Sequence, residues 1–107
     1  MTTIIVRFTA PGFHRWKDAP PHRAYLGERH RHLFHVEARL TVKHDDREVE
    51  FHDLLDFCRD AFVLLTDWSC EKAARELRDA IREKWPNRKC SVSVFEDGEC
   101  GALVEEG

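Results

Sequence analysis

The chain has 107 residues, of which 42% are hydrophobic and 35% are charged, a composition typical of one globular domain spanning residues 1–107. The formal net charge of −3 argues against a nucleic-acid binder that relies on excess positive charge. No apolar run reaches the roughly 20 residues that cross a bilayer, and the first residues lack the pattern of a signal peptide. We therefore expect a cytoplasmic protein that binds neither nucleic acid nor membrane.

The cysteines and histidines are the residues most informative about chemistry. None of the four cysteines forms a C-x-x-C pair, and without an export signal we expect reduced thiols. Seven histidines are many for a chain of this length, and they direct attention to metal binding or acid–base chemistry.

The N-terminal segment Thr2–Phe8 alternates between apolar and polar residues and is rich in β-branched side chains, which predicts a strand. The Pro11-Gly12 pair is expected to end this strand. Residues Phe13–Arg29 show no clear period and are expected to form a long loop.

The clearest pattern runs from His30 to Val42, where every second residue is apolar or histidine and the residues between are mostly charged. This alternation predicts a long strand with one buried and one solvated face, and it places His30 and His32 on the buried side. Residues 44–47 are then expected to form a turn.

Two helices should follow. Apolar residues at helical spacing predict the first from Phe51 to Leu65. Ser69 is expected to cap the second, whose apolar stripe runs from Cys70 to Ile81 and which Pro86 ends.

The C-terminal part predicts a second hairpin, with strands Ser91–Glu96 and Gly101–Glu105 joined by a turn at residues 97–99. The predicted order is thus ββααββ. We expect an α+β domain with a four-stranded antiparallel sheet, made of two hairpins, and both helices on one face.

Three histidines are candidate metal ligands. Period two places the Cα atoms of His30 and His32 about 7 Å apart on one strand face, close enough for both imidazoles to reach one ion at about 2.0–2.1 Å. His14 can supply a third ligand if the loop folds back. Three neutral imidazoles with an open position are typical of a catalytic zinc site. The alternative is a structural domain with incidental histidines, and the remaining four histidines are expected in solvent.

Glu96 is a candidate ligand-binding residue. It follows Val92 and Val94 on the same strand face, and a carboxylate there needs hydrogen-bond donors. A guanine-like edge offers two adjacent N–H donors to one carboxylate. Alternatively, Glu96 begins the turn and faces solvent. Glu71 is a second candidate, although the helix dipole alone also favours a glutamate in a first turn.

Five motifs in order give the chain a resemblance to the 6-pyruvoyl-tetrahydropterin synthase / 6-carboxy-tetrahydropterin synthase family, as a divergent member. They are Phe8-Thr9-Ala10 followed by His14, His30-Arg31-His32 in place of the family's H-G-H, Glu50-Phe51-His52-Asp53-Leu54, Ser69-Cys70-Glu71 and Glu96.

The resemblance implies the tunnelling fold and a Zn²⁺ ion held by His14, His30 and His32. It implies that Glu96 anchors the pyrimidine edge of a pterin. It further implies carbon–oxygen lyase activity on a dihydroneopterin-triphosphate-like substrate or a place in the deazaguanine (queuosine) pathway. Family members assemble into barrels, and an isolated sheet would expose its edges, so we expect a homo-oligomer with sites at subunit interfaces.

The chain departs from this family at the proton relay. The family carries a cysteine shortly before the H-x-H, whereas here Leu26 stands four residues before His30 and Phe13–Arg29 contains no cysteine. The family's L-D-H segment between the helices is also absent. Cys70, at a helix N-terminus that would lower its pKa, is the best replacement, unless it is only a small apolar residue of the helix stripe. The chain is then either a tetrahydropterin synthase-like enzyme or a non-catalytic module that binds a pterin, guanine or deazaguanine compound.

Overall fold

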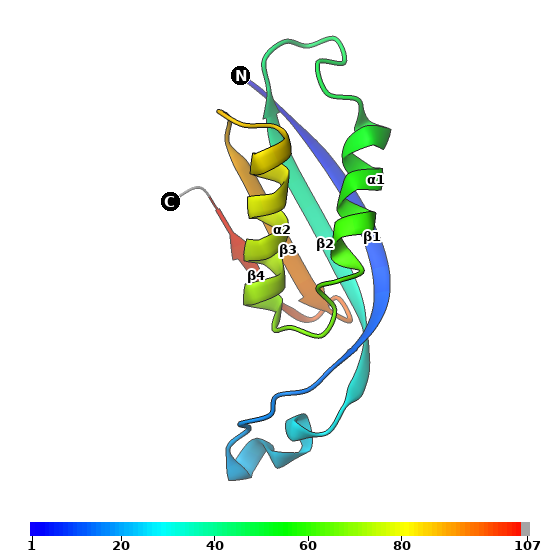
Figure 1. Cartoon of the computed structure of the whole chain (residues 1–107), viewed down its shortest axis with the longest axis vertical. Coiled ribbons are helices and arrows are strands. Elements are labelled where there is room, and N and C mark those ends of the chain that lie inside the picture. The colour runs from blue at the N-terminus through cyan, green and yellow to red at the C-terminus, as the bar shows by residue number, and fades with distance from the viewer. Residues whose placement is uncertain (106–107) are drawn as a thin grey trace.

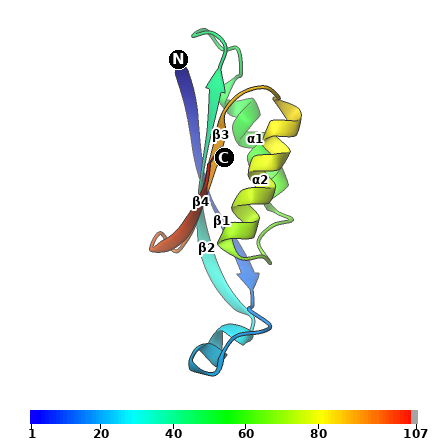
Figure 2. The same ribbon diagram turned by 90° about the vertical axis from the view of Figure 1, so that its left-hand side faces the viewer.

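The computed structural model describes residues 1–105 and shows a four-stranded sheet with two helices packed on one face (Figures 1 and 2). In chain order the elements are β1 (Thr2–His14), the short 3-10 helix η1 (Pro21–Gly27), β2 (His30–Val42), α1 (Phe51–Phe62), α2 (Cys70–Lys84), β3 (Cys90–Glu96) and β4 (Cys100–Val104). The strands pair antiparallel in the order β1-β2-β3-β4. The α+β class, the two hairpins and the placement of both helices on one face are confirmed.

Strand β1 is longer than predicted, because Pro11 and Gly12 do not end it. Pro11 pairs with Leu33 in an edge strand, where a residue without an N–H is tolerated. Gly12 is buried against the α1–α2 connection, and a Cβ at this position would lie 2.5 Å from Cβ of Thr66. Glycine therefore lets the strand pass under this connection and continue to His14.

The expected loop is the tip of a long hairpin. Strands β1 and β2 each have 13 residues, which at about 3.3 Å per residue gives roughly 43 Å. The molecule accordingly measures 51 × 25 × 22 Å. At the tip, Trp16 N donates to Leu26 O at 2.7 Å and closes the chain around η1. The hairpin projects beyond both helices (Figure 1).

The helices begin as predicted, and α1 ends earlier. The hydroxyl of Ser69 accepts a hydrogen bond from Lys72 N at 3.2 Å and caps α2. The carboxylate of Glu50 accepts from His52 N and caps α1. Helix α1 ends at Phe62 rather than Leu65, and turns lead on to Ser69.

The core lies between the helices and the inner face of the sheet. Its fully buried side chains come from all these layers and include Phe34, Leu40, Leu54, Phe62, Leu77, Ile81, Val92 and Val94. Of the helices in residues 1–105, none is both long and apolar enough to cross a membrane. No disulfide joins the four cysteines, all of which lie in this range.

Candidate metal centre

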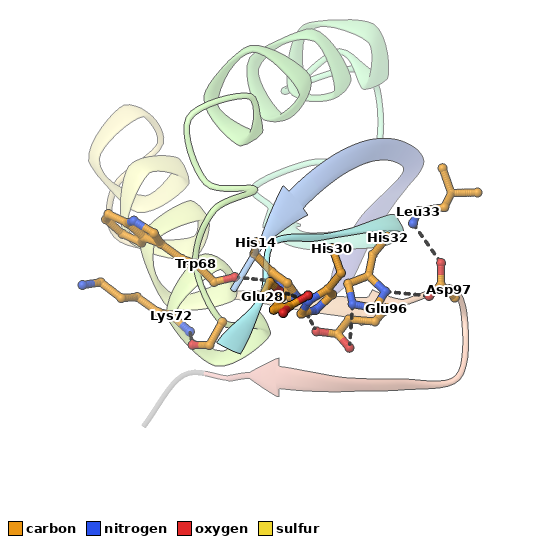
Figure 3. A network of polar contacts seen from close by, with 10 residues as sticks. His14, Glu28, His30, His32, Leu33, Trp68, Lys72, Glu96 and Asp97 are labelled. Carbon is orange, nitrogen blue, oxygen red and sulfur yellow. Dashed lines mark hydrogen bonds and ion pairs between the residues drawn. The ribbon is translucent and has the colours of Figure 1, made fainter. Parts of the chain in front are cut away.

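The inner face of the β1–β2 hairpin brings the three predicted histidines together just beyond the helices (Figure 3). His14 is the direct partner of His30 across the two strands, and His32 pairs with Gly12 two residues along. Alternation places all three side chains on the same face. Each pair of imidazole rings has a centroid distance of 4.7 Å, and one ligand atom from each lies within 4.8 Å of the others.

The three imidazoles share one orientation, in which Nδ1 is hydrogen-bonded away from the cluster. The contacts are His14 Nδ1 to Trp68 O at 3.2 Å, His30 Nδ1 to Glu28 O at 2.7 Å, and His32 Nδ1 to Asp97 Oδ2 at 2.7 Å. Carbonyl and carboxylate oxygens only accept hydrogen bonds, so each Nδ1 carries the proton. In a neutral imidazole of this orientation, Nε2 has a lone pair that can bind an ion.

The Nε2 atoms of His30 and His32 are buried and have no hydrogen-bond partner. Burying a polar nitrogen without a partner costs free energy. A cation bound among the three Nε2 atoms would remove this cost, and imidazoles oriented through Nδ1 are typical of metal-binding histidines. The residues therefore fit a metal ion, and His14, His30 and His32 could hold one.

The charge state of His14 also suits a metal ligand. Burial lowers the pKa of its imidazole, although the hydrogen bond to Trp68 and the charge of Glu96 act in the opposite direction. A lowered pKa keeps the imidazole neutral to lower pH, and the neutral form is the one that binds a metal.

Glu96 ends β3 beside the three imidazoles. It lies on the same face as Val92 and Val94, as the alternation predicts. Its carboxylate oxygens lie 3.2 Å from His14 Nε2 and 3.6 Å from His32 Nε2, and 31% of the side chain is exposed. The carboxylate places a negative charge beside the position that a cation would occupy.

A cleft of about 610 Å³ opens next to this cluster. The long β1–β2 hairpin contributes Arg15, Trp16 and Leu26 to its lining. The lining also includes five of the six residues singled out from the sequence: His14, His30, Cys70, Glu71 and Glu96. The cleft is thus shared by the histidine cluster, the start of α2 and the end of β3. Glu71 itself is exposed in the first turn of α2.

The predicted lowering of the pKa of Cys70 is wrong. The thiol is buried, with 6% of the residue exposed, and its hydrogen bond with Glu96 adds to the effect of nearby negative charge. Burial first, and then the charges of Glu96 and Glu71, raise the pKa of Cys70 to about 12. These effects outweigh the helix N-terminus, so the thiol stays protonated at neutral pH.

The groups that orient the imidazoles were not identified from the sequence. Two of them are the main-chain carbonyls of Glu28 and Trp68, which no residue pattern identifies. The third, Asp97, was interpreted only as a turn residue. Its position directly after Glu96 in the predicted hairpin turn was the one available signal. The other four histidines, His22, His35, His44 and His52, are exposed as expected.

Comparison with models of protein families gives no match to this chain, and comparison with curated proteins gives no significant match.

Proposed function

We propose that this chain is a zinc-dependent, 6-pyruvoyl/6-carboxy-tetrahydropterin synthase-like protein of the tunnelling fold, acting on a pterin or purine-type substrate such as a dihydroneopterin-triphosphate-like compound. One observation carries the proposal: the buried Nε2 atoms of His30 and His32 have no hydrogen-bond partner and lie beside a third imidazole. Three imidazoles leaving a position open toward a cleft are typical of catalytic zinc.

Each residue of the cleft has a role in this proposal. His14, His30 and His32 hold the metal, which when bound acts as a Lewis acid on a substrate oxygen. Glu96 accepts the two N–H donors of the pyrimidine edge, since its carboxylate lines the cleft. Glu71, at the cleft margin, is the second candidate for this contact.

A synthase needs a proton-transfer residue, and Cys70 is the expected one. With a pKa of about 12, Cys70 holds its proton at neutral pH and is a poor base. This observation favours the second candidate function, a non-catalytic module that binds a pterin, guanine or deazaguanine compound in the same cleft.

A single-turnover experiment separates the two functions. Zinc-loaded protein in excess over dihydroneopterin triphosphate is quenched at intervals, and the compounds are separated by liquid chromatography and mass spectrometry. A synthase converts the substrate, and chelation abolishes the conversion. A binding module returns the compound unchanged while calorimetry shows saturable binding.

The role of Glu96 is tested by Glu96→Gln. In the amide, an N–H₂ donor replaces one of the two acceptor oxygens and faces an N–H of the ligand. Hydrogen bonds to a charged group are worth about 1.5–3 kcal/mol. We expect ligand affinity to fall about 10- to 100-fold. The control is Glu99→Gln, an exposed glutamate on the neighbouring turn outside the cleft. Equal affinities for the two variants would remove Glu96 from the proposal.

We also propose a homo-oligomer with sites at subunit interfaces. Strands β1 and β4 are the edge strands of the sheet, and each offers one edge for pairing with another copy. Light scattering coupled to size-exclusion chromatography measures the mass in solution. A monomer at all concentrations would contradict the shared-site arrangement.

A further inference from the structure

Asp97 is fixed against β2 by three hydrogen bonds. One carboxylate oxygen accepts from Leu33 N at 2.9 Å, and the other accepts from His32 Nδ1 at 2.7 Å (Figure 3). Its own main-chain N–H donates to Leu33 O at 2.7 Å. The residue sits in the β3–β4 turn with φ of +53°, a conformation that Asp, Asn and Gly tolerate better than other residues.

Asp97 differs in kind from the two other groups that contact an Nδ1 atom of the cluster. His14 and His30 contact main-chain carbonyls, which keep their acceptor character whatever the residue type. His32 contacts a side chain, and only there does residue identity decide which imidazole nitrogen carries the proton.

We propose that Asp97 is a positioning residue of the metal centre: it holds His32 as the Nδ1–H tautomer, so that the Nε2 lone pair faces the ion. The inference rests on the metal site of the proposed function. A carboxylate hydrogen-bonded to a metal-binding histidine also increases the basicity of that ligand. Together with Glu96 it supplies two negative charges near a divalent cation held by neutral imidazoles.

Two substitutions at this position are expected to act in different ways. In Asp97→Asn, Oδ1 keeps the bond from Leu33 N–H, and the amide N–H₂ then faces His32 Nδ1 as a donor. This arrangement stabilises the opposite tautomer, whose protonated Nε2 cannot bind a metal. Asp97→Gly tolerates the same φ and removes the side chain, and His32 Nδ1 can then donate to water, because the Asp97 side chain is 46% exposed.

The experiment measures Zn²⁺ affinity by competition with a chelator in the wild type, Asp97→Asn and Asp97→Gly. We expect Asp97→Asn to weaken binding about 10- to 100-fold, the usual effect of losing such a partner, and Asp97→Gly to weaken it less. Glu99→Gln, two residues away in the same turn, is the control. Circular dichroism reports whether each variant folds.

A second readout needs no metal. Long-range ¹H–¹⁵N spectra of the metal-free protein distinguish Nδ1–H from Nε2–H imidazoles. We expect His32 as Nδ1–H in the wild type and a shift toward Nε2–H in Asp97→Asn, which a residue that only forms the turn would not cause.

Zinc binding by the wild type tests the metal centre, and zinc binding by Asp97→Asn tests the role of Asp97. If the wild type binds zinc and Asp97→Asn binds it equally well with an unchanged tautomer, Asp97 is only a turn residue and the inference is wrong. If the wild type binds no zinc, the metal centre itself is wrong, and the inference fails with it.

Discussion

The inner face of the sheet has two regions that share one backbone geometry and differ in what covers them. Under the helices, the alternating positions of β2 and β3 carry Ala38, Leu40, Val92 and Val94, all buried. Beyond the helices, the same alternation carries His30 and His32 on β2, with Glu96 ending β3. Alternation thus decides which side chains point inward, and the covering layer decides whether they form a core or a site.

The boundary between these regions is the row in which Ala10, Phe34, Glu96 and Cys100 pair across the sheet. The ring centroid of Phe34 lies 5.8 Å from that of Phe62 in α1 and 5.5 Å from that of His14. The histidine cluster therefore contacts the edge of the hydrophobic core through Phe34. The following predictions test how independent the two regions are.

The largest expected effect is loss of metal binding in His32→Ala. Two imidazoles remain, and we expect no stoichiometric binding at micromolar zinc, whereas circular dichroism shows an unchanged fold. For the wild type, zinc at about 100 times its Kd should raise the free energy of unfolding by about 2.7 kcal/mol. His22→Ala, at an exposed histidine of the hairpin tip, is the control. Zinc stabilisation of His32→Ala equal to that of the wild type would contradict the site.

The matching change in the covered region is Leu77→Ala. Leu77 is fully buried on α2, and truncating such a leucine costs about 2–5 kcal/mol of stability. Urea unfolding of the metal-free protein measures the loss. Below the unfolding transition, one equivalent of zinc should still bind. Loss of binding in the folded variant would show that the regions are not separable.

A smaller effect on both regions is expected from Gly12→Ala. The added Cβ would lie 2.5 Å from Cβ of Thr66 and 2.9 Å from the ring of Phe34, and overpacking of this kind costs about 1–3 kcal/mol. Since Trp68, which orients His14, lies in the same connection, zinc affinity should fall as well. The double variant with Thr66→Gly should recover part of both losses. If the stability losses of Gly12→Ala and Thr66→Gly simply add in the double variant, the contact between residues 12 and 66 is not the cause.

The smallest effect concerns pH. The pKa of His14 in the folded protein lies below its ordinary value of 6.5. Between these two pKa values the unfolded chain therefore binds more protons than the folded protein. The contribution of His14 to the free energy of unfolding is therefore complete above pH 6.5. It is lost as the pH falls from 6.5 through the lower pKa of His14 in the folded protein. Urea unfolding of metal-free protein between pH 5 and 8 should show this slope, and His14→Ala should reduce it. An unchanged slope in the variant would assign it to other groups.

Local patterns predicted the elements with a strong period or a capping residue. The alternation from His30 to Val42 predicted β2, and Ser69 predicted the start of α2. The spacing of His30 and His32 predicted two members of the histidine group that could hold a metal ion. What the sequence did not indicate depends on contacts between distant segments. The extension of β1 through Gly12 depends on Thr66, and the pKa of Cys70 depends on burial and on Glu96. The hydrogen bond of the His32 imidazole is made with Asp97, 65 residues away.

The central claim is that three imidazoles bind one ion. Zinc K-edge X-ray absorption on protein loaded with one equivalent tests it directly. The account predicts a four-coordinate site with three imidazole nitrogens at about 2.0–2.1 Å and one further light ligand. A six-coordinate oxygen shell, or fewer than three imidazoles around the zinc, would contradict it.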